Sequence, residues 1–112
     1  MTNAEINTAL YQKMFAEQSQ YRDQLRTMTP EEILGQAYEF VCREDILLSL
    51  EYNDLSTKQA EALLKSDTPL ADVFKKLESW ETSHMDDVWS AVAAQANDIM
   101  RADFIASRRE ER

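Results

Sequence analysis

Turn-forming residues are scarce in this sequence, since its 112 residues include one glycine and two prolines. A β-sandwich or β-barrel needs many such residues at the turns between its short strands. A phosphate-binding loop or a dinucleotide-binding fingerprint needs several glycines, because the backbone must approach the ligand closely. The scarcity therefore favours an all-α fold and excludes P-loop and Rossmann enzymes.

Cysteine and long apolar runs are also nearly missing. Cys42 is the only cysteine, so one chain forms neither an internal disulfide nor a thiolate zinc site. No uncharged stretch approaches the roughly 20 residues that span a bilayer, and the N-terminus lacks the features of a signal sequence. These absences predict a soluble, cytoplasmic protein that does not contact a membrane.

Two helices are predicted in the first half of the chain. From residue 4 to about residue 26, apolar residues recur at steps of four or seven and define one helical face: Ile6, Leu10, Met14, Tyr21 and Leu25. Thr29 and Glu32 form a capping box around Pro30, which suits the first helical position. This second helix runs to about Tyr52, and its predicted core stripe is Ile33, Ala37, Phe40, Val41, Leu47 and Leu48.

Two more helices are predicted in the second half. Ser56 and Gln59 form another capping box, which starts a short helix over residues 57–65. Thr68 caps a fourth helix and Pro69 opens it. Its apolar residues keep one phase to about residue 106: Leu70, Val73, Phe74, Leu77, Trp80, Met85, Val88, Val92 and Ile99. The expected fold is a compact bundle of four main helices in a single domain, residues 1–112, with residues 107–112 frayed.

The predicted fourth helix is too long for a compact chain, because about 37 residues extend over roughly 55 Å. It either breaks near residues 82–84, where Ser83 and Asp86 are possible caps, or protrudes and is covered by a second chain. The unbroken apolar phase favours continuity. Small residues in this region permit close helix packing, so a homodimer through the fourth helix is expected: Ala91, Ala93, Ala94 and Ala96.

The net charge of −9 is concentrated in two segments. Residues 27–55 hold seven acids against one base, and residues 69–87 hold five acids against two bases. Such a surface repels the phosphate backbone of nucleic acid, so direct nucleic-acid binding is not expected. It attracts basic protein surfaces instead. The simpler alternative is that the acids only keep the protein soluble.

Acidic residues fall among the apolar positions of the second predicted helix. Glu44, Asp45 and Glu51 lie inside or beside the apolar arc, where an unpaired buried carboxylate is costly. One explanation is internal ion pairing, with these possible partners: Arg22, Arg26 and Arg43. The other is a face that binds a basic partner, with these residues: Glu39, Glu44, Asp45, Glu51 and Asp54.

Catalytic and metal-binding equipment is sparse. Glu81 and His84 have the Glu-x-x-His spacing of di-iron bundles, but with one histidine per chain two such motifs arise only across a dimer. Cys42 lies beside the apolar arc and is interpreted as a core residue, and no nucleophile is placed beside His84. Trp80 and Trp89 are interpreted as core or interface residues. No cofactor and no enzymatic activity are expected.

Three segments carry a resemblance to a known family: "YRDQL", "PEEILGQAYEFVCREDILLSLEYNDLS" and "QAEALLKSDTPLADVF". Together they resemble a domain of unknown function found in gut Firmicutes and in proteins of their mobile elements and phages, over roughly residues 10–85. The resemblance implies a setting in which small acidic helical proteins include inhibitors of host defence nucleases, among them anti-CRISPR proteins. It assigns no activity to any residue.

The sequence therefore leads to one main functional expectation and two alternatives. The main expectation is a non-enzymatic accessory protein of a mobile element or phage, whose acidic face imitates nucleic acid. It would occupy the basic channel of a host nuclease such as a CRISPR effector. The alternatives are an adaptor module that docks other proteins of the same element, and a dimeric carboxylate metal enzyme.

Overall fold

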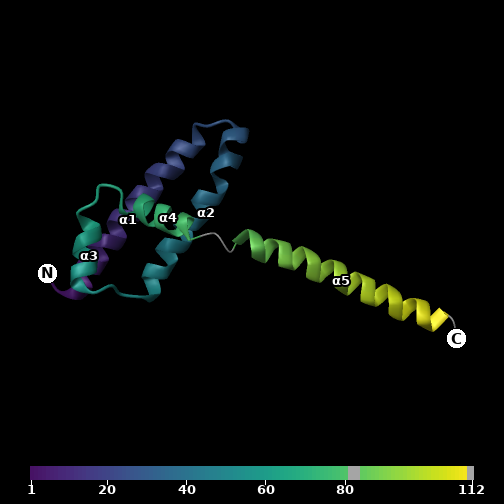
Figure 1. Ribbon diagram of the computed structural model, residues 1–112. Coiled ribbons are helices and arrows are strands. Elements are labelled where there is room, and N and C mark those ends of the chain that lie inside the picture. The colour runs from purple at the N-terminus through teal and green to yellow at the C-terminus, as the bar shows by residue number, and fades with distance from the viewer. Residues whose placement is uncertain (81–83, 111–112) are drawn as a thin grey trace. The chain divides into compact units, whose positions relative to one another are not determined.

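The structure, a computed structural model, describes residues 1–80 and 84–110. This part of the chain is helical without any strand, which confirms the all-α prediction (Figure 1). It contains five helices instead of the four predicted: α1 (Asn3–Arg26), α2 (Pro30–Tyr52), α3 (Thr57–Leu64), α4 (Pro69–Ser79) and α5 (His84–Glu110). None of these helices is both long enough and apolar enough to cross a membrane.

The predicted fourth helix is in fact two helices, so the continuity that its apolar phase favoured is wrong. α4 ends at Ser79 and α5 begins at His84, near the break that was the alternative. Asp86 and Asp87 lie in the first turn of α5, where the helix dipole favours negative side chains. These acidic residues favour the start of a new helix, although the apolar spacing continues from α4 into α5. Ser83, the other possible cap, lies outside the described residues.

The chain divides into two compact units, Met1–Glu78 with α1 to α4 and Ser79–Arg112 with α5. The expectation of one compact bundle is therefore wrong, because the last helix belongs to a separate unit. The physical reason is the distribution of buried apolar side chains, which in the described part of the chain all belong to the first unit. Within the described part of α5, no side chain is buried.

Capping boxes set the starts of the first three helices. The Thr29 hydroxyl accepts from the Glu32 N–H and the Ser56 hydroxyl from the Gln59 N–H, as predicted. Thr2 and Glu5 make a third box, which starts α1 at Asn3. α4 begins differently, because the Glu17 carboxylate on α1 accepts from the backbone N–H groups of Leu70 and Ala71, at 2.8 and 2.9 Å. These two hydrogen bonds anchor the start of α4 to α1.

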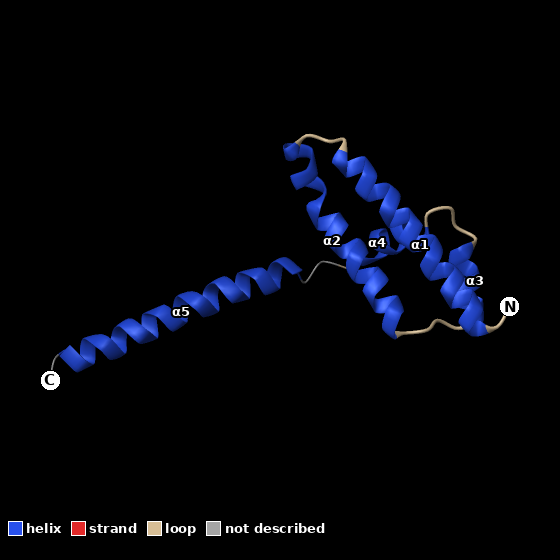
Figure 2. Cartoon of the chain, turned by 180° about the vertical axis from the view of Figure 1, so that it is seen from behind, coloured by secondary structure: helices blue, strands red, loops and turns tan. Residues whose placement is uncertain are grey.

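The core of the first unit is built on α1, which packs against both α2 and α3 (Figure 2). The buried face of α1 is the predicted one, and Leu10 and Met14 are fully buried. Each of the other helices of this unit contributes at least one side chain to the same cluster: Cys42, Ile46 and Leu47 from α2, Ala60 from α3, and Leu70 and Phe74 from α4.

The predicted core stripe of α2 is largely wrong. Cys42, Ile46 and Leu47 are buried, and only Leu47 was in the predicted stripe. The members of that stripe that lie in solvent are Ile33, Ala37, Val41 and Leu48. α2 carries apolar residues around more than one face, so helical spacing alone cannot tell which face meets α1. An apolar face of α2 therefore remains uncovered.

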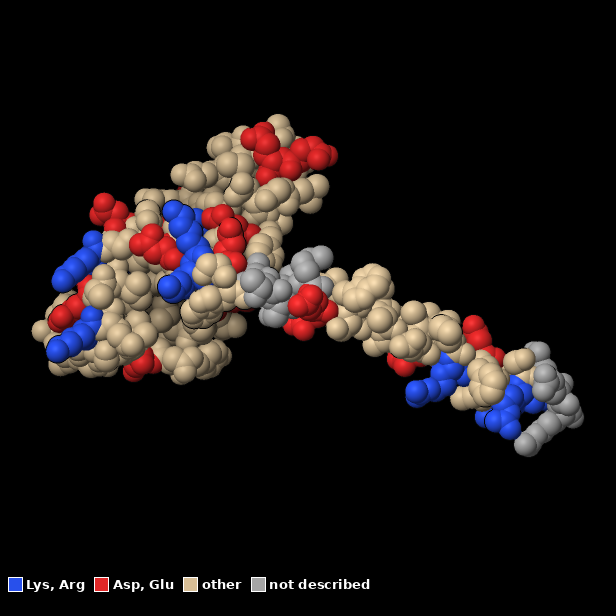
Figure 3. Space-filling view, in the orientation of Figure 1, with Lys and Arg blue, Asp and Glu red and all other residues tan. Residues whose placement is uncertain are grey.

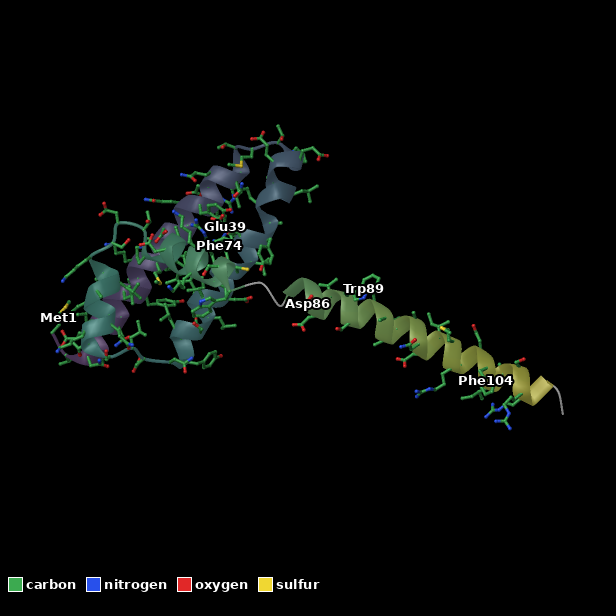
Figure 4. The ribbon with its side chains drawn as sticks, viewed as in Figure 1. Met1, Glu39, Phe74, Asp86, Trp89 and Phe104 are labelled. Atoms are coloured by element: carbon green, nitrogen blue, oxygen red, sulfur yellow. The ribbon has the colours of Figure 1, made fainter. Side chains whose placement is uncertain are left out.

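The large aromatic residues of the second unit also differ from their core interpretation. Trp80 is 67% exposed and Trp89 is 71% exposed. Figure 4 shows Trp89 and Phe104 projecting from α5. Neither tryptophan is therefore a core residue, and the interface interpretation stays a prediction.

Candidate protein-binding groove

Three hollows lie along the seam between α1 and α2, and together we call them the α1–α2 groove. The first, of about 300 Å³, is lined by Arg22, Leu25, Arg26, Ile33, Ala37, Phe40 and Val41. The second, of about 270 Å³, is lined by Tyr11, Phe15, Glu44, Asp45, Leu47, Leu48 and Glu51. The third, of about 440 Å³, is lined by Ala4, Asn7, Thr8, Tyr11, Leu50, Glu51, Tyr52 and Asp54.

Exposed apolar side chains form the walls of this groove. Val41 and Leu48 are seven residues apart on α2, so they lie on the same side of the helix. They are 56% and 50% exposed, and Phe15 on α1 is 52% exposed. Contiguous apolar surface of this kind typically marks a site of interaction. Sequence reasoning missed Phe15, although its place four residues after Tyr11 was a usable signal.

Two of the five predicted acidic residues are neutralised by arginines of the first unit. Glu44 forms an ion pair with Arg22 at 2.8 Å and accepts a hydrogen bond from Gln18 at 3.2 Å. Glu39 pairs with Arg43 one turn further along α2. Arg26, another proposed partner, pairs instead with Asp23 on its own helix, with 3.8 Å between Nη1 and Oδ1. Internal pairing, one of the two explanations offered by the sequence, therefore accounts for Glu44.

The other three predicted acids are exposed. Among the described residues, no arginine or lysine lies within ion-pair distance of Asp45, Glu51 or Asp54. Glu51 instead accepts a hydrogen bond from the Tyr11 hydroxyl at 2.8 Å. This bond raises the pKa of Tyr11, because it stabilises the protonated phenol beside a carboxylate. Asp45, Glu51 and Asp54 thus present charge at one end of the groove.

The groove is polarised along its length. Arg22 and Arg26 line the first hollow, whereas Glu44, Asp45 and Glu51 line the second. The ion pair of Arg22 with Glu44 joins the two hollows. Charge is mixed elsewhere as well, because in Figure 3 the acidic patches on the visible face of the first unit are separated by basic and neutral side chains.

A buried polar layer holds the two walls together. The Arg43 guanidinium lies over the Tyr21 ring, 4.1 Å from its centroid, and Arg43 is 8% exposed. Burial raises the pKa of Tyr21, whose hydroxyl donates to Gln36 at 2.7 Å. Gln18 is buried beneath Glu44. It was not predicted, although it lies four residues after Met14, in phase with the buried face of α1.

The profile of a family described as "Protein of unknown function (DUF3848)" matches residues 6–100. The chain belongs to the DUF3848 family. The family's pattern therefore covers all of α2, α3 and α4, nearly all of α1 and the larger part of α5. No curated protein and no solved structure matches the chain.

The catalytic and metal-binding alternatives gain no structural support. Within residues 1–80 and 84–110, no three His, Cys, Asp or Glu side chains are arranged to hold a metal ion. Glu81 lies outside the described residues, and His84 is the first residue of α5. Cys42 is buried as predicted, and burial raises the pKa of its thiol, which disfavours the nucleophilic thiolate.

Proposed function

We propose that this protein is a non-enzymatic interaction module that binds another protein through the α1–α2 groove. The observation that carries the proposal is the row of exposed apolar side chains beside exposed carboxylates, with Val41 and Leu48 next to Asp45 and Glu51. Apolar side chains in water gain free energy when a partner covers them. The carboxylates then select the charge of that partner.

The shape of the site fits an amphipathic helix, because a groove between two helices accepts apolar anchors spaced by one or two turns. Anchors on such a helix would enter beside Val41 and Leu48. Lysine or arginine residues on its flank would meet Asp45, Glu51 and Asp54 at the acidic end. The partner is therefore a protein with a basic, amphipathic helical surface.

The resemblance to a domain found in mobile elements and phages supplies a setting for this protein–protein interaction. In that setting the protein is an accessory protein of a mobile element or phage, and its partner is either another protein of the element or a host protein. This part of the proposal rests on the resemblance, and gene neighbours that encode other proteins of a mobile element would support it.

A second candidate function is inhibition of a host nuclease, such as a CRISPR effector, by imitation of nucleic acid. The exposed carboxylates of Asp45, Glu51 and Asp54 favour it, because a basic channel would bind them. The ion pairs of Glu39 with Arg43 and of Glu44 with Arg22 reduce the charge available for this purpose. We therefore rank imitation of nucleic acid below binding of a partner through the apolar side chains of the groove.

Site-specific photo-cross-linking in living host cells tests the leading proposal. A photoreactive residue at Leu48 is expected to capture a partner that the same residue at Glu61, exposed on α3, does not capture. Leu48→Lys should then weaken binding of the purified partner at least about tenfold, because it removes an apolar anchor. Glu61→Lys is the matched control. Equal capture from both positions would contradict docking in the groove.

Salt and charge reversal separate the two candidates. An acidic mimic should lose inhibition of nuclease cleavage when Asp45, Glu51 and Asp54 are changed to Lys, and its binding should weaken steeply with added salt. Docking in the groove should depend more on Leu48 than on salt. Full inhibition by the folded triple variant would refute the mimic.

A further inference from the structure

α5 carries an apolar row that has no partner within its own unit. It is the only helix in the described part of Ser79–Arg112, and its large apolar side chains are exposed. Six of them share one side of the helix by their spacing: Val88, Trp89, Val92, Ile99, Met100 and Phe104. Helical segments in water gain most of their stability from packing such a face. A second helix is therefore needed to cover the row.

The row has a symmetric size pattern. Large side chains stand at both ends, and between them the row passes over the small residues Ala93 and Ala96. An antiparallel pair of identical helices centred on Ala96 places alanine against alanine, which allows close approach. In that register Val88 lies opposite Phe104, and Val92 lies opposite Met100. The bulky ends of one helix therefore meet the bulky ends of the other.

The charges at the ends of α5 also favour an antiparallel pair. Asp86 and Asp87 lie in its first turn, and Arg108 and Arg109 lie in its last turn. In an antiparallel pair the acids of one helix lie near the bases of the other, whereas a parallel pair brings like charges together. Figure 3 shows the basic side chains of this helix towards its C-terminal end.

One carboxylate falls within the apolar row and needs a partner there. In the antiparallel register centred on Ala96, Asp103 of one helix lies opposite Trp89 of the other. The indole N–H of tryptophan is a donor, so it can satisfy the carboxylate at the edge of the interface. A parallel arrangement in register would instead place Asp103 beside a second Asp103.

We infer that α5 binds the α5 of a second copy of the chain as an antiparallel pair centred on Ala96. The pair covers the row from Val88 to Phe104, about 25 Å of helix at 1.5 Å per residue. This inference does not depend on the function proposed for the α1–α2 groove. It assigns the apolar surface of the second unit to self-association.

Sedimentation equilibrium of the full chain tests the association. The wild type is expected to dimerise, and Val92→Glu with Ile99→Glu should raise the dimer dissociation constant at least about a hundredfold, because it places charge in the interface. Val41→Glu with Leu48→Glu on α2 is the matched control and should remain dimeric. A monomeric wild type at every concentration would overturn the inference. So would loss of the dimer in the control, which would assign it to the groove.

Charge exchange and cysteine pairing test whether the two α5 helices are antiparallel. These tests remain valid even if the glutamate variants lose helical structure. Asp86→Arg with Asp87→Arg should weaken the dimer severalfold, and adding Arg108→Asp with Arg109→Asp in the same chain should restore it. A mixture of Val88→Cys and Phe104→Cys chains in a glutathione redox buffer should form mixed disulfides. Disulfides only between identical variants, or no rescue by the second charge change, would overturn the antiparallel arrangement.

Discussion

α1 and α5 are similar in sequence character but differ in what covers them. Both are long helices with apolar residues at helical spacing, of 24 and 27 residues. Leu10 and Met14 of α1 are fully buried, whereas Trp89 and Phe104 of α5 are more than half exposed. An amphipathic pattern therefore predicts a helix, whereas the rest of the chain decides what packs against its apolar face.

Truncation of a buried residue of α1 should have the largest effect on the free energy of unfolding. Leu10→Ala is expected to lower the free energy of unfolding of the first unit by about 3 kcal/mol, because it leaves a cavity beneath α2 and α3. Val92→Ala on α5 should leave the unfolding of this unit nearly unchanged. Urea denaturation monitored by helical circular dichroism measures both. Equal destabilisation by the two substitutions would contradict the division into units.

Loss of a paired acid should have a moderate effect. Glu39→Ala removes the carboxylate that pairs with Arg43, which is 8% exposed. Because the guanidinium is then left without its ion-pair partner, we expect a loss of about 1–2 kcal/mol in the free energy of unfolding. Asp45→Ala is the matched control on the exposed side of α2 and should change it by less than about 0.5 kcal/mol. The same urea series measures both, and indistinguishable values would argue against a structural role for the pair.

Removal of a glycine should stabilise α2 slightly. Gly35 lies within the helix, and beyond its two chain neighbours and the backbone of its own helix a Cβ added there would meet no atom within 4 Å. Gly35→Ala is expected to add about 0.5–1 kcal/mol to the free energy of unfolding, because alanine loses less backbone entropy. Thermal unfolding measures the gain. A lower melting temperature would show that this turn of α2 needs the glycine for another reason.

The smallest expected effect is a change in the pKa of Tyr11 at the acidic end of the groove. The hydrogen bond to Glu51 raises the pKa of Tyr11, so Glu51→Gln should bring that pKa back towards its ordinary value of 10.0. Since the folded-state pKa is raised, the stabilisation it reflects is complete below the unfolded pKa and is lost as pH rises through the folded one. A pH titration of the Tyr11 ring by NMR measures the change. An unchanged pKa of Tyr11 in Glu51→Gln would contradict the role of this hydrogen bond.

Features set by local chemistry were predictable from the sequence. The helix starts at Pro30 and Thr57 follow from capping boxes that involve residues only three apart. The buried face of α1 was predicted because most of the large apolar residues of that helix lie on it. The turns and the exclusion of sheet folds follow from the same local signals.

Features set by distant contacts were not predictable. On α2, Val41 was in the predicted core stripe and is exposed, whereas Ile46 was outside that stripe and is buried. Packing against α1 decides which face of this helix is covered. The pairing of Glu44 with Arg22 joins residues on different helices, so the sequence offered it only as one of several possibilities. The separation of α4 from α5 was obscured by an apolar phase that continues from one helix to the other.

Hydrogen exchange of the full chain at two protein concentrations tests the central contrast most directly. We expect amides in α5 to exchange at least about tenfold faster after dilution below the dimer dissociation constant, because α5 is protected only when paired. Amides around Leu10 and Ile46 should exchange at the same slow rate at both concentrations. Concentration-independent protection of α5, equal to that of α1, would contradict the account.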